Sequence, residues 1–196
     1  MPFCYAPWTN LDIDTRGNIG PCCKFRYETY DVKQANIITS DLKNYTSSKL
    51  LEDIKKNFSN DQWPEGCIRC RTEEENGIQS KRQLDYERWQ EQFNNYNQQI
   101  GGFLTASIAF GNTCNLKCIT CGPGSSSRWH KEYKLIYNKT HKPNHFYKEN
   151  FIHDLTNSCP ELIHLDIPGG EPFLSGVEQQ IATFCKELDI KYGDDI

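Results

Sequence analysis

Ten cysteines dominate the chemistry open to this chain of 196 residues. One group is scattered over the N-terminal third, and a second group is packed into eight consecutive positions. The full set is Cys4, Cys22, Cys23, Cys67, Cys70, Cys114, Cys118, Cys121, Cys159 and Cys185. In a chain without an export signal, clustered thiols more often bind metal or do redox chemistry than form disulfides. The cysteines therefore predict a metalloprotein or an iron–sulfur protein.

The tight group, Cys114, Cys118 and Cys121, lies in a loop over residues 111–124, here called the cysteine loop. Three thiolates from one loop can hold three irons of a [4Fe–4S] cube and leave the fourth iron open. Zinc is the alternative, but structural zinc usually takes four closed ligands from Cys-x2-Cys pairs. The closest histidine downstream, His130, would be carried away by a helix. The spacing therefore favours iron–sulfur.

A glycine turn over residues 169–172 follows the next expected strand, and on its own it is an ordinary turn. The two motifs read Cys114-Asn115-Leu116-Lys117-Cys118-Ile119-Thr120-Cys121 and Gly169-Gly170-Glu171-Pro172. Taken together they make the chain resemble the radical S-adenosylmethionine (radical SAM) superfamily. Thr120 is a departure, because many members have an aromatic residue before the third cysteine.

The resemblance implies an enzyme that uses S-adenosylmethionine. The cysteine loop would bind a [4Fe–4S] cluster whose open iron chelates that cofactor. Backbone carbonyls of Gly169 and Gly170 and the carboxylate of Glu171 would help to hold it. Reductive cleavage would give a 5′-deoxyadenosyl radical, which abstracts hydrogen from a substrate. The electron would come from a one-electron reductant of the flavodoxin or ferredoxin type.

The scattered cysteines indicate a second site. Four thiolates, those of Cys4, Cys22, Cys67 and Cys70, could close a zinc site. Residues 4–8, 17–22 and 63–70 together resemble a SPASM or twitch module, which binds an auxiliary [4Fe–4S] cluster in radical SAM enzymes. Four cysteines match the smaller twitch type. Such modules usually follow the barrel, whereas this one precedes it.

No role in metal binding is predicted for the remaining three cysteines. Cys22 fits the spacing of the module better than Cys23, which we expect to be a buried neighbour. Cys159 and Cys185 are expected to be ordinary buried thiols.

Hydrophobic periodicity predicts the elements that must position these residues. Helices are expected over 48–58, 80–93, 125–137 and 177–188, with a helical turn over 151–157. Strands are expected over 10–13, 18–19, 103–110 and 162–167. Amide-rich residues 94–99 are expected to form a linker and residues 141–150 a polar excursion.

The predicted fold class is α/β, because strand, helix, strand and helix alternate in the second half. An irregular α+β twitch/SPASM-like module over 1–78 would be followed by a helix and linker over 79–102. Residues 103–196 would form the N-terminal part of a radical SAM partial (β/α)6 barrel. Since they hold only two strands and two helices, we expect a truncated or split member that acts alone or is completed by a second polypeptide. The alternative is a non-catalytic iron–sulfur or zinc-binding fragment.

The substrate cannot be identified from the residues, although SPASM and twitch modules often occur in enzymes that modify peptides or proteins. Alternation along strand 162–167 puts His164 and Asp166 on one face and Ile163, Leu165 and Ile167 on the other. If the apolar face packs on helices, His164 and Asp166 would face the substrate. They could equally form a polar pair without a catalytic role.

Composition excludes several classes of protein. A net charge of −4 argues against a nucleic-acid binder that works through a basic face. No apolar run approaches the ~20 residues of a membrane span. The N-terminus has neither the basic nor the apolar region of a signal peptide. We therefore expect a cytoplasmic protein.

Overall fold

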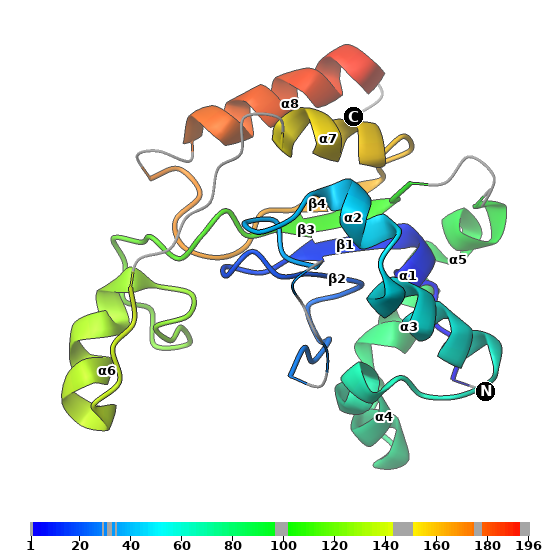
Figure 1. The fold of residues 1–196 in the computed structure, drawn as a ribbon, viewed down its shortest axis with the longest axis horizontal. Helices are drawn as coiled ribbons and strands as arrows, with labels where there is room; N and C mark the ends of the chain where they lie inside the picture. The colour runs from blue at the N-terminus through cyan, green and yellow to red at the C-terminus, as the bar shows by residue number, and fades with distance from the viewer. Residues whose placement is uncertain are drawn as a thin grey trace.

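A four-stranded sheet organises the molecule (Figure 1). The computed structural model describes residues 2–28, 30, 33, 35–96, 102–142, 151–174 and 178–192. The strands are β1 (Asn10–Ile13), β2 (Ile19–Gly20), β3 (Thr105–Ile108) and β4 (His164–Asp166), and their order is β2-β1-β3-β4. β1 is antiparallel to β2 and parallel to β3, and β3 is parallel to β4. The three parallel strands therefore end at one edge of the sheet.

Helices flank this sheet, and α7 and α8 lie together over one of its faces (Figure 1). The helical segments are α1 (Ala6–Thr9), α2 (Leu42–Thr46), α3 (Lys49–Ser59), η1 (Glu65–Cys67), α4 (Ile68–Glu75), α5 (Lys81–Asn95), η2 (Ser127–Trp129), α6 (His130–Tyr137), α7 (Phe151–Ser158) and α8 (Glu178–Tyr192). The Ser48 side chain caps α3 by accepting a hydrogen bond from the Leu51 amide. Ser80 and Gln83 form a capping box at the start of α5. The helices predicted over 48–58 and 80–93 are confirmed.

The two faces of the sheet differ in polarity because side chains alternate along each strand. Leu11, Ile13, Ala106 and Ile108 are buried in the core. Helices α2, α3, α7 and α8 supply the other side of that core, through residues that include Leu42, Ile54, Leu155 and Phe184. The opposite face carries Asn10, Asp12, Thr105, Ser107, His164 and Asp166, in register across the three parallel strands.

The architecture corrects one aspect of the expected layout. A mixed α/β fold is confirmed, but the described residues form an open sheet and no barrel. The hairpin predicted over 10–13 and 18–19 is present, yet β1 also pairs with β3, so the N-terminal segment and the segment after residue 102 share one sheet. The physical reason is that Leu11 and Ile13 extend the apolar surface made by Ala106 and Ile108.

Several predicted elements differ at their ends. The helix expected over 125–137 is a 3-10 turn, η2, followed by α6. Part of the expected linker is helical, because α5 continues to Asn95. Residues 97–101 of the linker, 143–150 of the polar excursion and 175–177 before α8 lie outside the described residues. Over the described parts of the chain, no helix has both the length and the apolar character needed to cross a bilayer.

Candidate functional site

Loops that leave the three parallel strands interlock at one edge of the sheet. The Thr15 hydroxyl, after β1, donates to the Gly124 carbonyl at 2.8 Å. The Gly170 amide, after β4, donates to the Ser125 carbonyl at 3.0 Å, and the next amide, that of Glu171, donates to Thr113 at 2.8 Å. The glycine turn and the cysteine loop are therefore held in direct contact. Ligands of open α/β sheets collect at this edge.

Hydrogen bonds to backbone carbonyls hold the cysteine loop. The Ser126 hydroxyl donates to the Leu116 carbonyl at 2.7 Å. The Trp129 indole N–H donates to the Cys118 carbonyl at 3.1 Å. Cys118 is exposed, and Cys114 and Cys121 are half-buried, all with free thiols. The Cys114 thiol also accepts a hydrogen bond from the Leu116 amide at 3.3 Å. Since none of the three thiols forms a disulfide, they remain available to an iron–sulfur cluster.

His130 stays close to the cysteine loop, although a helix was expected to carry it away. Its Nε2 lies 3.0 Å from the Pro123 carbonyl oxygen. Helix α6 only begins at His130, so the side chain remains beside the loop.

Glycine is required in the turn over residues 169–172 by its close approach to neighbouring backbone. Gly169 and Gly170 have φ of +84° and +39°. A Cβ on Gly170 would lie 2.4 Å from the Thr113 carbonyl oxygen, and one on Gly169 would lie 2.9 Å from Ala109 Cβ. The Glu171 carboxylate accepts from the Phe173 amide at 3.2 Å. The turn thus places two glycines and a carboxylate beside the cysteine loop.

The scattered cysteines meet at a second place in the molecule. Cys4, Cys22, Cys67 and Cys70 all line one small cavity beneath the hairpin. Cys4 precedes α1, Cys22 follows β2, Cys67 ends η1, and Cys70 lies in the first turn of α4. These four thiols, called the N-terminal thiol set below, are the four that the sequence assigns to an auxiliary cluster.

Contacts of Phe25, Arg26 and Tyr30 with Gly66 of η1 bring the hairpin to α4. The Phe25 ring lies on Gly66, where a Cβ would come within 2.2 Å of it. The Arg26 amide donates to the Gly66 carbonyl at 2.9 Å, and the Tyr30 hydroxyl accepts from the Gly66 amide at 3.3 Å. As a result, Cys22 and Cys67 line the same cavity.

Charged groups surround the N-terminal thiol set. Lys24, Lys81 and Arg82 line the cavity and form ion pairs with Glu73, Asp85 and Glu74, respectively. Burial raises the pKa of the Cys4 thiol to about 12. Burial also raises the pKa of the Cys22 and Cys67 thiols well above their ordinary value. Binding a metal there would release protons, and the cations would offset the charge of the thiolates formed.

The donor chemistry at both places fits iron–sulfur clusters. Across the described residues, no three His, Cys, Asp or Glu side chains lie close enough to share one metal ion. A [4Fe–4S] cube attaches each thiolate to a different iron, so its ligands lie further apart than those of a single ion. Four thiols face one cavity, and three lie in one ordered loop.

The three remaining cysteines were expected to be buried, but two of them are exposed. Cys159 is fully buried, as expected. Cys185 is exposed, because Ile181 and Phe184 occupy the buried stripe of α8 and Cys185 is turned about 100° from Phe184. Cys23 is also exposed, and it points to the polar sheet face rather than to the N-terminal thiol set.

The polar face of the sheet adjoins the N-terminal thiol set. His164 and Asp166 lie there side by side, with His164 Nε2 3.3 Å from Asp166 Oδ2. A cavity of about 100 Å³ is lined by both residues and by Asp12, Cys23, Lys81 and Trp89. Trp89 of α5 contacts the His164 ring at a centroid distance of 5.5 Å. The cavity also includes Cys22, so it adjoins the N-terminal thiol set.

Asp12 is the site residue that sequence reasoning missed. It is only 6% exposed and faces the same cavity as His164. Burial raises the pKa of its carboxyl to about 7, against the lowering effect of a hydrogen bond with Ser107. Alternation with Leu11 and Ile13 was a usable signal, but only the pairing of β1 with β3 places Asp12 beside the other polar residues.

Asp12 should make stability depend on pH. Its ordinary pKa of 3.8 applies to the unfolded chain, so between about pH 4 and 7 only the folded chain keeps the proton. The contribution of Asp12 to the free energy of unfolding is therefore fully present below pH ~4 and is lost as the pH rises to ~7. An Asp12→Asn variant should therefore be more stable than wild type at pH 8, by several kcal/mol at most, and the gain should shrink toward pH 4.

Urea unfolding of both proteins at pH 5 and pH 8 measures this difference. Glu52→Gln is the control, because Glu52 is exposed on α3. An advantage of Asp12→Asn that is equal at both pH values would contradict the prediction.

Comparison with known families places the N-terminal cysteines in a known kind of domain. Residues 4–71 match the family model of SPASM, an iron-sulfur cluster-binding domain. The match begins at Cys4 and includes Cys22, Cys67 and Cys70. The SPASM-like module predicted from the sequence is therefore confirmed. Neither curated proteins nor solved structures gave a match.

Proposed function

We propose that this chain is a radical SAM protein that carries an auxiliary iron–sulfur cluster in its N-terminal module. The observation that carries the proposal is the contact between the cysteine loop and the glycine turn at the carboxyl edge of the parallel strands. The SPASM match over residues 4–71 adds independent support, because this domain is typical of radical SAM enzymes.

The proposal gives each described group a role. Cys114, Cys118 and Cys121 would hold a [4Fe–4S] cluster, and Cys4, Cys22, Cys67 and Cys70 would hold the auxiliary one. Bound in the cysteine loop and reduced by an external one-electron donor, a cluster with one open iron would supply the electron for reductive cleavage of S-adenosylmethionine. Backbone carbonyls of Gly169 and Gly170 would help to hold the ligand, and the Glu171 carboxylate would accept hydrogen bonds from its ammonium group. Hydrogen bonds from Ser126 and Trp129 keep the cysteine loop in one conformation.

The polar face of the sheet is the proposed substrate site. It adjoins the N-terminal thiol set and carries hydrogen-bonding groups on three strands, among them Asp12, His164 and Asp166. A peptide or protein segment is the proposed substrate class. The Cys22 side of the cavity would bring that segment close to the auxiliary cluster.

Partners follow from the chemistry and from exposed apolar surface. A one-electron donor of flavodoxin or ferredoxin type would reduce the clusters. A second polypeptide is the proposed cover for the open edge of β4, which in the described residues pairs with β3 alone. Near the cysteine loop and the glycine turn, Leu116, Ile119 and Phe173 are 52%, 93% and 77% exposed. Exposed side chains of this kind mark contact surfaces.

Anaerobic reconstitution tests the proposal. About eight irons and eight sulfides per chain are expected from two cubes. Addition of S-adenosylmethionine and a reductant should then yield 5′-deoxyadenosine and methionine, with or without a candidate second polypeptide. Stoichiometric zinc without sulfide would overturn the cluster assignment. Full clusters without 5′-deoxyadenosine in either condition would leave a non-catalytic iron–sulfur protein as the function.

Cys22 and Cys23 should differ sharply despite being neighbours. Cys22→Ser removes a thiol from the N-terminal thiol set and should lower the iron content by about four atoms per chain. Cys23→Ser should leave the iron content unchanged, because Cys23 faces the polar sheet cavity. Iron and sulfide analysis of the two reconstituted variants measures this. Equal losses would show that both thiols, or neither, serve as ligands.

A further inference from the structure

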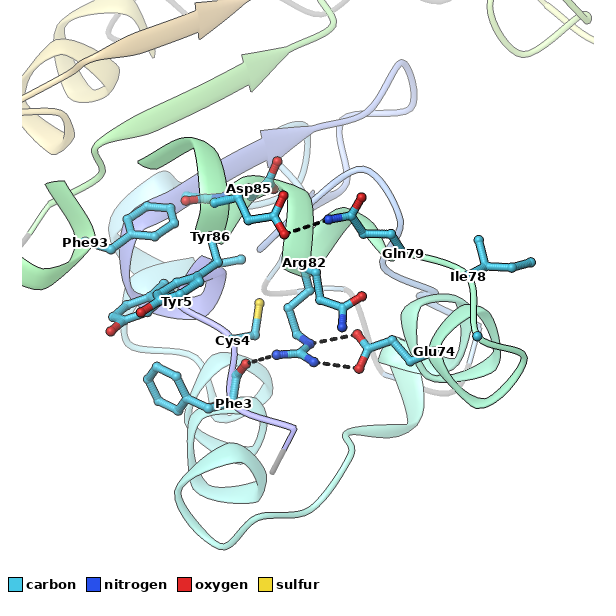
Figure 2. Close-up of a pocket in the computed structure, with 15 residues that line it drawn as sticks. Phe3, Cys4, Tyr5, Glu74, Ile78, Gln79, Arg82, Asp85, Tyr86 and Phe93 are labelled. Carbon is cyan, nitrogen blue, oxygen red and sulfur yellow. Dashed lines mark hydrogen bonds and ion pairs between the residues drawn. The ribbon is translucent and has the colours of Figure 1, made fainter. Parts of the chain in front are cut away.

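A second groove shares Asn10 and Asp85 with the cavity on the polar sheet face, and it carries no role so far. It has a volume of about 580 Å³, within the range of ligand-binding pockets. One wall consists of aromatic rings, those of Phe3, Tyr5, Tyr86 and Phe93 (Figure 2). The other wall is formed by the connection between α4 and α5, including Ile78 and Gln79. We call this the Tyr86 groove.

Stacked rings make the aromatic wall rigid. Tyr5 stacks on Tyr86 with centroids 5.7 Å apart and on Phe93 with centroids 4.9 Å apart. Phe3 meets the Tyr5 ring edge-on at 4.9 Å. Tyr86 and Phe3 nevertheless remain 37% and 41% exposed, so their outer surfaces are open to a ligand. An aromatic face of this kind attracts cations.

The guanidinium of Arg82, which lines the groove, is already paired inside the protein. Arg82 pairs with Glu74 through Nε at 2.9 Å and Nη2 at 2.5 Å, and its Nη1 donates to the Phe3 carbonyl at 2.6 Å (Figure 2). All three guanidinium nitrogens are therefore engaged inside the protein. Because Glu74 already balances the charge of Arg82, a phosphate or carboxylate ligand meets no unpaired Lys or Arg among the residues that line the groove, so the groove disfavours anions.

The remaining charge in the groove is negative. Glu74, Asp85 and Glu87 line it against the single guanidinium of Arg82. Asp85 pairs with Lys81, and Glu87 accepts from the neutral Gln79 amide at 2.7 Å. Glu87 is exposed, so its carboxylate can accept further hydrogen bonds from a ligand. The groove therefore offers acceptors and aromatic faces to a ligand that carries donors.

From this combination we propose that the Tyr86 groove binds a basic side chain, lysine or arginine, of a peptide. The carbon stem of that side chain would lie against Tyr86 and Ile78, which is 60% exposed, and the cationic head would reach Glu87. Phe3 is exposed and offers apolar surface to the peptide residues on either side of the basic side chain. Cys4 lines both this groove and the cavity of the N-terminal thiol set, so the peptide would bind beside the auxiliary cluster.

Fluorescence anisotropy tests the groove without requiring turnover. The probes are three labelled nonapeptides in which alanine alternates with lysine, norleucine or glutamate, and the protein is the anaerobically reconstituted chain. The lysine peptide should bind about tenfold or more tightly than the norleucine peptide, and added salt should weaken its binding. Equal affinity for lysine and norleucine peptides, or tighter binding of the glutamate peptide, would overturn the proposal.

Variants show whether the lysine peptide binds in the groove or is attracted only by the net negative charge of the protein. Glu87→Gln and Tyr86→Ala should each weaken binding of the lysine peptide about two- to fivefold. Glu91→Gln is the matched control, because Glu91 is exposed one turn further along α5 and does not line the groove. A loss in Glu91→Gln as large as in Glu87→Gln would overturn the site. Formation of 5′-deoxyadenosine without peptide should be unchanged in Glu87→Gln, so failure of the groove and failure of the proposed function are distinguishable.

Discussion

A Cys118→Ala variant should form no 5′-deoxyadenosine and should keep only about four of about eight irons. Removing one of three thiolates leaves two ligands, which is too few for a cube that the cysteine loop must hold alone. The loop itself should survive, because Trp129 bonds the backbone carbonyl of Cys118 and alanine retains that carbonyl. Product analysis and iron analysis of the reconstituted variant measure both effects.

Two further cysteine variants serve as comparisons for this result. Cys185→Ala should keep all the iron and the full product yield, because Cys185 is an exposed thiol on α8. Cys67→Ala should lose only the auxiliary iron, since Cys67 belongs to the N-terminal thiol set. If Cys118→Ala keeps all its iron and forms the normal amount of 5′-deoxyadenosine, the cysteine loop does not bind the cluster needed for this reaction.

A Gly170→Ala variant should bind S-adenosylmethionine at least about tenfold more weakly, a change of about 1.4 kcal/mol. The new Cβ would lie 2.4 Å from the Thr113 carbonyl oxygen, and φ is +39°. Backbone cannot yield as a flexible side chain can, so the glycine turn must move away from the cysteine loop. That movement breaks the hydrogen bonds from Gly170 to Ser125 and from Glu171 to Thr113.

Gly124→Ala supplies the matched control for this effect. A Cβ on Gly124 meets no atom within 4 Å, and its carbonyl can still accept from Thr15. Equilibrium dialysis with labelled S-adenosylmethionine, together with iron analysis, compares the two variants. Auxiliary iron should be retained in both. Equal affinities for S-adenosylmethionine would mean that the glycine turn does not contribute to the site.

Local features of the fold could be predicted from neighbouring residues. Leu50, Leu51, Ile54 and Phe58 recur at helical spacing, and all four are buried on α3 as that pattern predicts. Alternation predicted that His164 and Asp166 share a face of β4, and they form a pair there. Such patterns depend on contacts within a few residues, where chain geometry leaves few alternatives.

Features that depend on distant pairing could not be predicted. The parallel pairing of Asn10 with Thr105 has no local signature, because no turn connects the two strands. Asp12 was therefore missed as a neighbour of His164. The Tyr86 groove also joins distant segments, since Phe3 and Tyr5 meet Tyr86 and Phe93 only in the folded chain.

The SPASM match supports the N-terminal thiol set, while the cysteine loop rests on a local pattern. Cys4 and Cys22 approach Cys67 because Phe25 packs on Gly66, a contact that spacing alone does not reveal. The cysteine loop, by contrast, is short enough for its spacing to predict its chemistry.

The position of β1 between β2 and β3 has a consequence for how the chain folds. During synthesis, the first cysteines and the hairpin emerge long before Thr105–Ile108, the strand that flanks β1. Closing so long a loop costs entropy and slows folding. Until β3 arrives, Leu11 and Ile13 lack the surface that later buries them beside Ala106 and Ile108. The N-terminal module should therefore reach its final form late, so a fragment that ends before residue 105 would expose one side of β1 and tend to aggregate.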